Sequence, residues 1–93
     1  MEEVLHIIVS GRVQGVGYRA FAEGAARRHG VAGWVRNRPS GDVELLARVR
    51  TEQKGRFLAE LQKGPPMSRV RDVQVQAAPE HMRCPESGFE VRI

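Results

Sequence analysis

VLHIIVSGRVQGVGYRAFAEGAARRH, residues 4–29, contains three different patterns in succession. Val4 to Val9 form an apolar run, interrupted only by His6, with the length and β-branched content of a buried strand. Residues 10–17 contain three glycines within seven residues, which predicts a loop. From Tyr18 to His29, apolar and small residues recur at steps of three and four, as on one face of an amphipathic helix. Gly30 is then expected to cap that helix at its C-terminus.

Residues 31–49 have the pattern of a β-hairpin. Val31, Trp34 and Val35 suit a strand over 31–38, and a second strand is expected over 43–49. The residues between them, Pro39-Ser40-Gly41-Asp42, have the composition of a turn.

The remaining residues predict one more helix and two strands. Thr51 is expected to be the N-cap of a helix that ends at Gly64-Pro65-Pro66. Val70, Val73 and Val75 then suggest a strand near 70–75. The alternation of apolar residues over 89–93 predicts a short closing strand, and a loop is expected over 79–87 between them.

The predicted order of elements is therefore β-α-β-β-α-β followed by a terminal strand. This is the split β-α-β pattern of the α+β class, in which two helices cover one face of a mainly antiparallel sheet. Right-handed crossovers place the first strand beside the third. At 93 residues the chain has room for a single domain, so residues 1–93 are expected to fold as one unit.

The composition excludes several classes of protein. The hydrophobic fraction of 41% and charged fraction of 28% are typical of globular domains. No apolar run approaches the roughly 20 residues that span a bilayer, and the N-terminus does not resemble a signal peptide, so we expect a cytoplasmic protein without membrane contact. The single cysteine, Cys84, predicts neither a disulfide nor a zinc site, and the histidines show no metal-ligand spacing.

The charge balance favours an anionic partner. Lysine and arginine number 15 against 11 acidic residues, giving a net charge of +4. Most of the basic residues are arginine, whose planar fork of donors suits phosphate. Both nucleic acid and small phosphates fit this balance.

The glycine-rich segment from Gly11 to Gly17 is the first candidate site, because it leads into a helix that carries Arg19 in its first turn. Backbone N–H groups and the helix dipole there favour an anion, and Arg19 would complete the cradle. The spacing matches neither the P-loop nor the dinucleotide-binding GxGxxG motif. A glycine-rich turn with a surface arginine is the simpler alternative.

Two separated motifs resemble those of the acylphosphatase family: GRVQGVGYR at Gly11 to Arg19 and GWVRN at Gly33 to Asn37. The similarity continues through PSGDVEL at 39–45, GPP at 64–66 and GFEVR at 88–92, and so covers nearly the whole chain. The fold that this resemblance implies, the ferredoxin-like sandwich, agrees with the order of elements predicted from pattern.

The resemblance implies an enzyme that hydrolyses the carboxyl-phosphate anhydride of a small acyl phosphate without a metal or cofactor. Arg19 would hold the phosphate and Asn37 would orient the attacking water; inorganic phosphate would be product and competitive inhibitor. The enzyme is expected to be a monomer that does not bind nucleic acid. The residues assigned to the phosphate site are Arg12, Val13, Gln14, Gly15, Val16, Gly17, Tyr18 and Arg19.

This chemistry is reasonable for these residue types. A carboxylate is a good leaving group, so hydrolysis depends on positioning and charge stabilisation more than on acid or base catalysis. Asn37 cannot act as a general base, but its amide oxygen can accept a hydrogen bond from water and orient it.

Alternatives remain for the fold and for individual residues. RNA-binding RRM domains share the order of elements, yet the first and third strands lack the aromatic residues that stack bases. A binding domain without turnover is a third possibility. Arg36 and Arg38 could steer anions, although a solvated strand is the simpler interpretation, and Asp42 and Glu44 are expected on a solvated hairpin.

Overall fold

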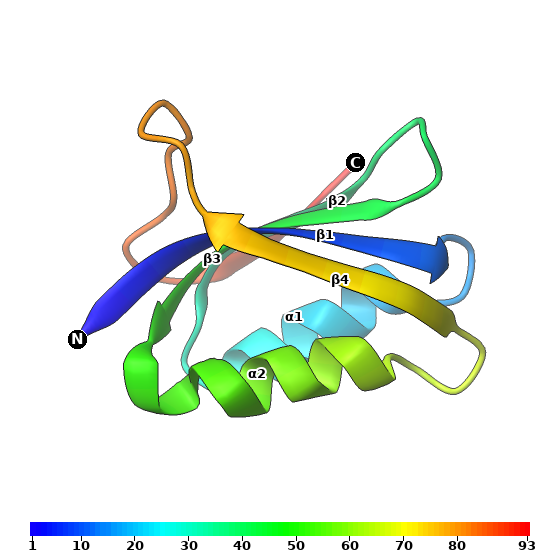
Figure 1. Ribbon diagram of the computed structural model, residues 1–93, viewed down its shortest axis with the longest axis horizontal. Helices are drawn as coiled ribbons and strands as arrows, with labels where there is room; N and C mark the ends of the chain where they lie inside the picture. The colour runs from blue at the N-terminus through cyan, green and yellow to red at the C-terminus, as the bar shows by residue number, and fades with distance from the viewer.

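The computed structural model describes all residues, 1–93, as two layers, with a sheet on one side and two helices on the other (Figure 1). The elements in chain order are β1 (Glu2–Arg12), α1 (Tyr18–Arg28), β2 (Ala32–Asn37), β3 (Val43–Arg50), α2 (Thr51–Lys63), β4 (Arg69–Ala77) and β5 (Phe89–Arg92). Neither helix has the length and apolar content that a membrane span requires.

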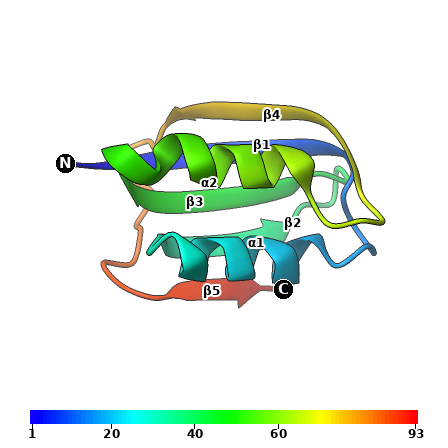
Figure 2. The same cartoon turned by 90° about the horizontal axis from the view of Figure 1, so that it is seen from below.

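The five strands are arranged in the order β4-β1-β3-β2-β5, and both helices lie on the same face of the sheet (Figure 2). Neighbouring strands are antiparallel except β2 and β5, which run parallel. The split β-α-β prediction is therefore confirmed, including the placement of the first strand beside the third.

The hydrophobic core fills the space between the helices and the sheet. Leu5, Ile7 and Val9 alternate along β1 and are buried, as expected for a strand with one face on the core. Phe57 and Leu61 contribute the apolar stripe of α2, four residues apart. This packing fixes both helices against the sheet and so determines where their ends lie.

The first strand is longer than predicted. The sequence indicates a loop from residue 10, but β1 continues to Arg12, with a shift of register between Ser10 and Gly11 where it pairs with β4. Gly11 has φ +124°, and a Cβ there would lie 2.1 Å from the carbonyl oxygen of Arg69. Because a glycine permits this bulge, the strand passes through it, and the loop shortens to residues 13–17.

The predicted end of α1 is correct to within one residue, whereas the predicted cap of α2 is wrong. The N–H groups of Gly30 and Val31 donate to the carbonyls of Arg27 and Ala26, so Gly30 closes the helix as expected. At the start of α2, Arg50 occupies the N-cap position without a side-chain bond. The Thr51 hydroxyl donates instead to the carbonyl of Met1, at 3.2 Å.

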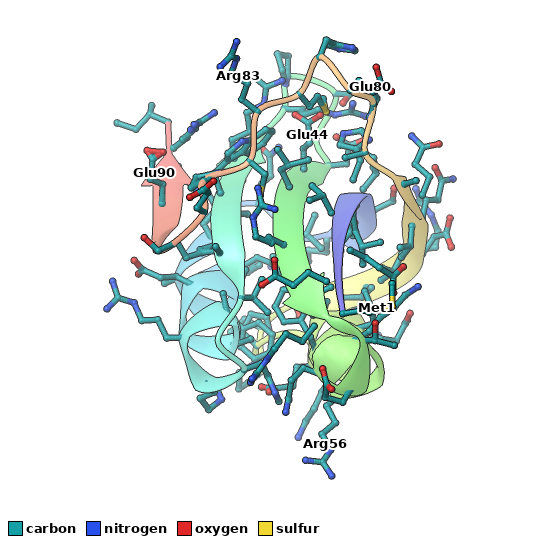
Figure 3. All side chains as sticks on the ribbon, turned by 90° about the vertical axis from the view of Figure 1, so that its left-hand side faces the viewer. Met1, Glu44, Arg56, Glu80, Arg83 and Glu90 are labelled. Carbon is teal, nitrogen blue, oxygen red and sulfur yellow. The ribbon has the colours of Figure 1, made fainter.

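The outer face of the sheet is partly covered by the chain between β4 and β5. The Arg48 guanidinium donates to the carbonyls of Cys84 and Pro85 and so attaches this segment to β3. Figure 3 shows Glu44 on this side of the sheet, away from the helices. Glu44 is buried, so the expectation of a solvated residue was wrong: it accepts hydrogen bonds from His6 at 2.6 Å and Arg36 at 2.5 Å.

Candidate active site

The loop of residues 13–17 connects the end of β1 to the start of α1. Its backbone N–H groups donate to no backbone carbonyl, and the first turn of α1 contains no acidic residue. Gly17 is the N-cap, with φ 80° and ψ 19°, a left-handed conformation in which it provides no capping side chain. The loop and the helix start therefore present free N–H donors with the positive end of the helix dipole.

Arg19 is the second residue of α1, and its side chain reaches across to β5. One Nη1 hydrogen is donated to the carbonyl of Arg92 at 2.8 Å. Figure 2 shows the corresponding arrangement of the backbone, with the end of β5 beside the start of α1. This contact uses a single one of the several guanidinium donors, which leaves the others available to an anion.

Asn37 is the last residue of β2 and pairs with Val43 across the hairpin. It is two residues from the core residue Val35 and therefore points to the helix side of the sheet. Its Oδ1 atom is buried and has no hydrogen-bond partner within the protein. A buried amide oxygen without a partner is rare, because desolvation costs about 1–3 kcal/mol when no bond replaces water.

A pocket of about 560 Å³ brings these groups together. Its lining residues are Val13, Gly15, Gly17, Tyr18, Arg19, Ala20, Glu23, Asn37, Val91 and Ile93. Both residues predicted to be catalytic are among them. Three of the predicted phosphate-site residues are not: Arg12, Gln14 and Val16.

The residues outside the pocket have other contacts. Arg12 ends β1, opposite Arg69 of β4. The Gln14 side chain is directed to the β2–β3 turn, where its amide nitrogen donates to the carbonyls of Arg38 and Asp42. Val16 packs at the edge of the hydrophobic core.

Four lining residues were missed from sequence: Ala20, Glu23, Val91 and Ile93. Glu23 lies one helical turn after Arg19, so the helix period could have indicated it. Val91 and Ile93 enter the pocket because β5 pairs in parallel with β2. No local pattern specifies that pairing.

The two arginines near Asn37 have carboxylate partners. Arg36 is bonded to Glu44 and lies over the Trp34 ring, 5.6 Å from its centroid. Arg38 forms a two-point contact with Asp42, at 2.6 and 2.9 Å. This hydrogen bond from Arg38 lowers the pKa of the Asp42 carboxyl, which stays ionised. Paired charges of this kind steer anions less than free ones do.

Tyr18 connects the start of α1 to α2. Its hydroxyl donates to the carbonyl of Leu61 at 2.7 Å, and burial raises its pKa above the usual value. The phenol therefore stays protonated and acts as a hydrogen-bond donor to the helix.

No group of three or more His, Cys, Asp and Glu side chains is arranged to hold a metal ion.

Comparisons with known proteins show which family this chain resembles. The sequence model of the family described as Acylphosphatase matches residues 5–91. An acylphosphatase of Bacillus licheniformis is 50% identical over 74 residues, which cover 80% of this chain and 82% of that relative. An acylphosphatase of Koribacter versatilis is 52% identical over 79 residues, covering 84% of this chain and 72% of the relative.

A solved structure extends the agreement to three dimensions. The crystal structure of acylphosphatase from Bacillus subtilis superposes with a TM-score of 0.86 and 36% identity, over 100% of both chains. Sequence model, relatives and structure lead to one assignment: the chain belongs to the acylphosphatase family and is an enzyme of that family.

Proposed function

We propose that this enzyme hydrolyses the carboxyl-phosphate anhydride of small acyl phosphates, giving a carboxylate and inorganic phosphate. The observation that carries the proposal is the pocket in which the free N–H groups of the 13–17 loop, the Arg19 guanidinium and the unpartnered Asn37 Oδ1 meet. The names of the relatives support the same reaction.

The phosphoryl group binds at the loop. The N–H groups of residues 13–17 and of the first turn of α1 donate to its oxygens, while the helix dipole and Arg19 supply positive charge. Arginine suits this position because its donors can engage two phosphate oxygens at once. Inorganic phosphate offers the same oxygens and binds there as product and competitive inhibitor.

Asn37 orients the attacking water. Its Oδ1 accepts a hydrogen bond from one O–H of the water, which leaves an oxygen lone pair free to attack phosphorus. The water oxygen bonds to phosphorus, the bond from phosphorus to the carboxylate oxygen breaks, and the water proton passes to a phosphate oxygen. An amide has no proton to take up near neutral pH, so Asn37 acts by position.

No metal takes part in the proposed reaction. The carboxylate leaves readily, and Arg19 with the N–H donors supplies the stabilising charge that a divalent ion supplies elsewhere. We propose that the enzyme acts as a monomer. We propose the cytoplasm as its location, where a single unpaired cysteine is stable.

The direct test is hydrolysis of an aromatic acyl phosphate such as benzoyl phosphate, followed by loss of the anhydride. We expect turnover well above the spontaneous rate, unchanged by dialysis against EDTA. Arg56→Ala is a matched control for substitutions of Arg19, because Arg56 is exposed and points away from the body of the molecule on α2 (Figure 3). Turnover equal to the spontaneous rate would overturn the proposal. Activity lost with EDTA and restored by magnesium or zinc would overturn its metal-free mechanism.

A further inference from the structure

The Gln14 side chain joins the phosphate loop to the hairpin that carries Asn37. Its Nε2 donates to the carbonyl of Arg38 at 2.7 Å and to the carbonyl of Asp42 at 2.8 Å. These residues are 24 and 28 positions away in sequence, and the contact is partly buried. Both amide hydrogens are therefore used within the protein.

The two carbonyls belong to one closely bonded turn. The Arg38 N–H donates to the Asp42 carbonyl at 2.9 Å, and the Gly41 N–H donates to the Arg38 carbonyl at 3.0 Å. The side chains of Arg38 and Asp42 are also paired. Because Arg38 directly follows Asn37, a restraint on this turn is a restraint on Asn37.

The loop has few other restraints. Its N–H groups donate no backbone hydrogen bond, and Gly15 and Gly17 both have positive φ, at 74° and 80°. Apart from its covalent ends, the loop is held by the buried Val13 side chain, the packing of Val16, the Gln14 amide and the Gly17 carbonyl, which accepts from the Phe21 N–H at 3.0 Å. Of these, only Gln14 connects the loop by hydrogen bonds to the β2–β3 turn.

We infer that Gln14 is a positioning residue, which sets the distance between the phosphate held by the loop and the water held by Asn37. The inference rests on the proposed function, in which these two groups bind the two reactants. A displacement of about 1 Å between reacting groups can lower a rate by about 100-fold, so a tie between the two binding elements has a direct effect on turnover.

The test is a double-mutant cycle between Gln14→Met and Asn37→Ala, with Gln62→Met as control. Methionine matches glutamine in length but donates no hydrogen bond, and Gln62 is exposed on α2, away from the pocket. Gln14→Met should lower kcat by about 10- to 100-fold, with phosphate Kd changed by less than about 3-fold. In the Asn37→Ala background the same substitution should change kcat by less than about 3-fold, since there is no longer a positioned water to misplace.

A second variant covers the case in which Gln14→Met is poorly folded. Gln14→Glu keeps the length, and its protonated acid can donate to one of the two carbonyls whereas its carboxylate cannot. The ratio of its kcat to that of the parent enzyme should rise as the pH falls through the titration of this carboxyl. A flat ratio would contradict the inference, because the hydrogen bond donated by residue 14 would then have no effect on turnover.

The outcomes separate this inference from the proposed function. Normal kcat in Gln14→Met beside an impaired Asn37→Ala, or an equal loss from Gln14→Met in both backgrounds, would overturn the role of Gln14 alone. Absence of turnover in the parent enzyme, or full turnover in Asn37→Ala, would overturn the proposed mechanism and this inference with it.

Discussion

Replacing Arg19 by alanine is the perturbation that most directly probes the phosphate site. One guanidinium hydrogen is bound to the Arg92 carbonyl at 2.8 Å, and the remaining donors border the pocket. If a pair of them binds phosphate, each charge-assisted bond contributes about 1.5–3 kcal/mol, or about 3–6 kcal/mol together. That free energy corresponds to a loss of phosphate affinity of roughly 100- to 20,000-fold.

The fold should tolerate the substitution, because Arg19 is partly exposed and is not one of the buried core residues. We expect the free energy of unfolding to change by about 0.5 kcal/mol or less, apart from the lost contact with Arg92. Arg19→Lys should recover only part of the affinity, since an ammonium is a point charge without the two-point geometry.

Isothermal titration with inorganic phosphate measures the affinity directly and works for variants without turnover. Arg56→Ala, which removes an exposed arginine from α2, controls for the change in net charge. Equal phosphate affinity in Arg19→Ala and Arg56→Ala would refute the reasoning and shift attention to Arg36 and Arg38 as the anion site.

Three further predictions concern stability. The Tyr18 hydroxyl is the only donor to the Leu61 carbonyl, because the residue four positions on, Pro65, has no N–H. Tyr18→Phe removes this donor, so we expect the free energy of unfolding to fall by about 1–3 kcal/mol. Thermal unfolding should show a drop in Tm of about 4–8 °C per kcal/mol, and an unchanged Tm would contradict the role of this bond. Burial disfavours the ionised form of Glu44, but hydrogen bonds from His6 and Arg36 outweigh it and lower the pKa of this carboxyl. A carboxyl whose pKa is lower in the folded state stabilises the fold at pH values above its unfolded-state pKa, and this stability is lost as the pH falls through the folded-state pKa. Glu44→Gln should therefore remove this contribution to the pH dependence of the free energy of unfolding. An unaltered pH profile in Glu44→Gln would contradict the stabilising role of the Glu44 carboxylate. Finally, inorganic phosphate at about 100 times its Kd should stabilise the parent enzyme by about 2.7 kcal/mol, while chloride at equal ionic strength should not; equal shifts would indicate general screening.

The sequence predicts the architecture well where the signal is local. The apolar run of β1, the stripe of α1 and its cap at Gly30 all follow from patterns and residue types that neighbouring residues determine. The errors have non-local causes. The extension of β1 to Arg12 depends on how closely the Arg69 carbonyl approaches Gly11, and the burial of Glu44 depends on partners from two other strands.

The candidate site shows the same division. Arg19 and Asn37 could be indicated from motifs, and the structure brings both to one pocket. Gln14 was assigned to the phosphate site as part of the loop backbone, whereas the partners of its side-chain amide, the carbonyls of Arg38 and Asp42, become visible only when the hairpin is folded against the loop. The contribution of Val91 likewise requires the parallel pairing of β5 with β2.

The RNA-binding alternative gains no support from the outer face of the sheet, where RRM domains stack bases on aromatic residues. At the corresponding strands, β1 contributes His6 and β3 contributes Glu44, which are hydrogen-bonded to each other. The chain between β4 and β5 is attached over part of this face through Arg48. A buried carboxylate on this face is a poor platform for an anionic polymer.

The central claim, that Arg19 and the loop bind the phosphate while Asn37 orients the water, is tested most directly by measuring kcat and phosphate Kd together in Asn37→Ala. A group that orients water acts in the transition state, so kcat should fall on the order of 100-fold while phosphate Kd stays within about 3-fold of the parent value. Asn37→Asp should be no better than alanine, because its carboxylate would repel the phosphate. Loss of phosphate binding in proportion to the loss of rate, or a rate in Asn37→Asp equal to that of the parent enzyme, would contradict the account.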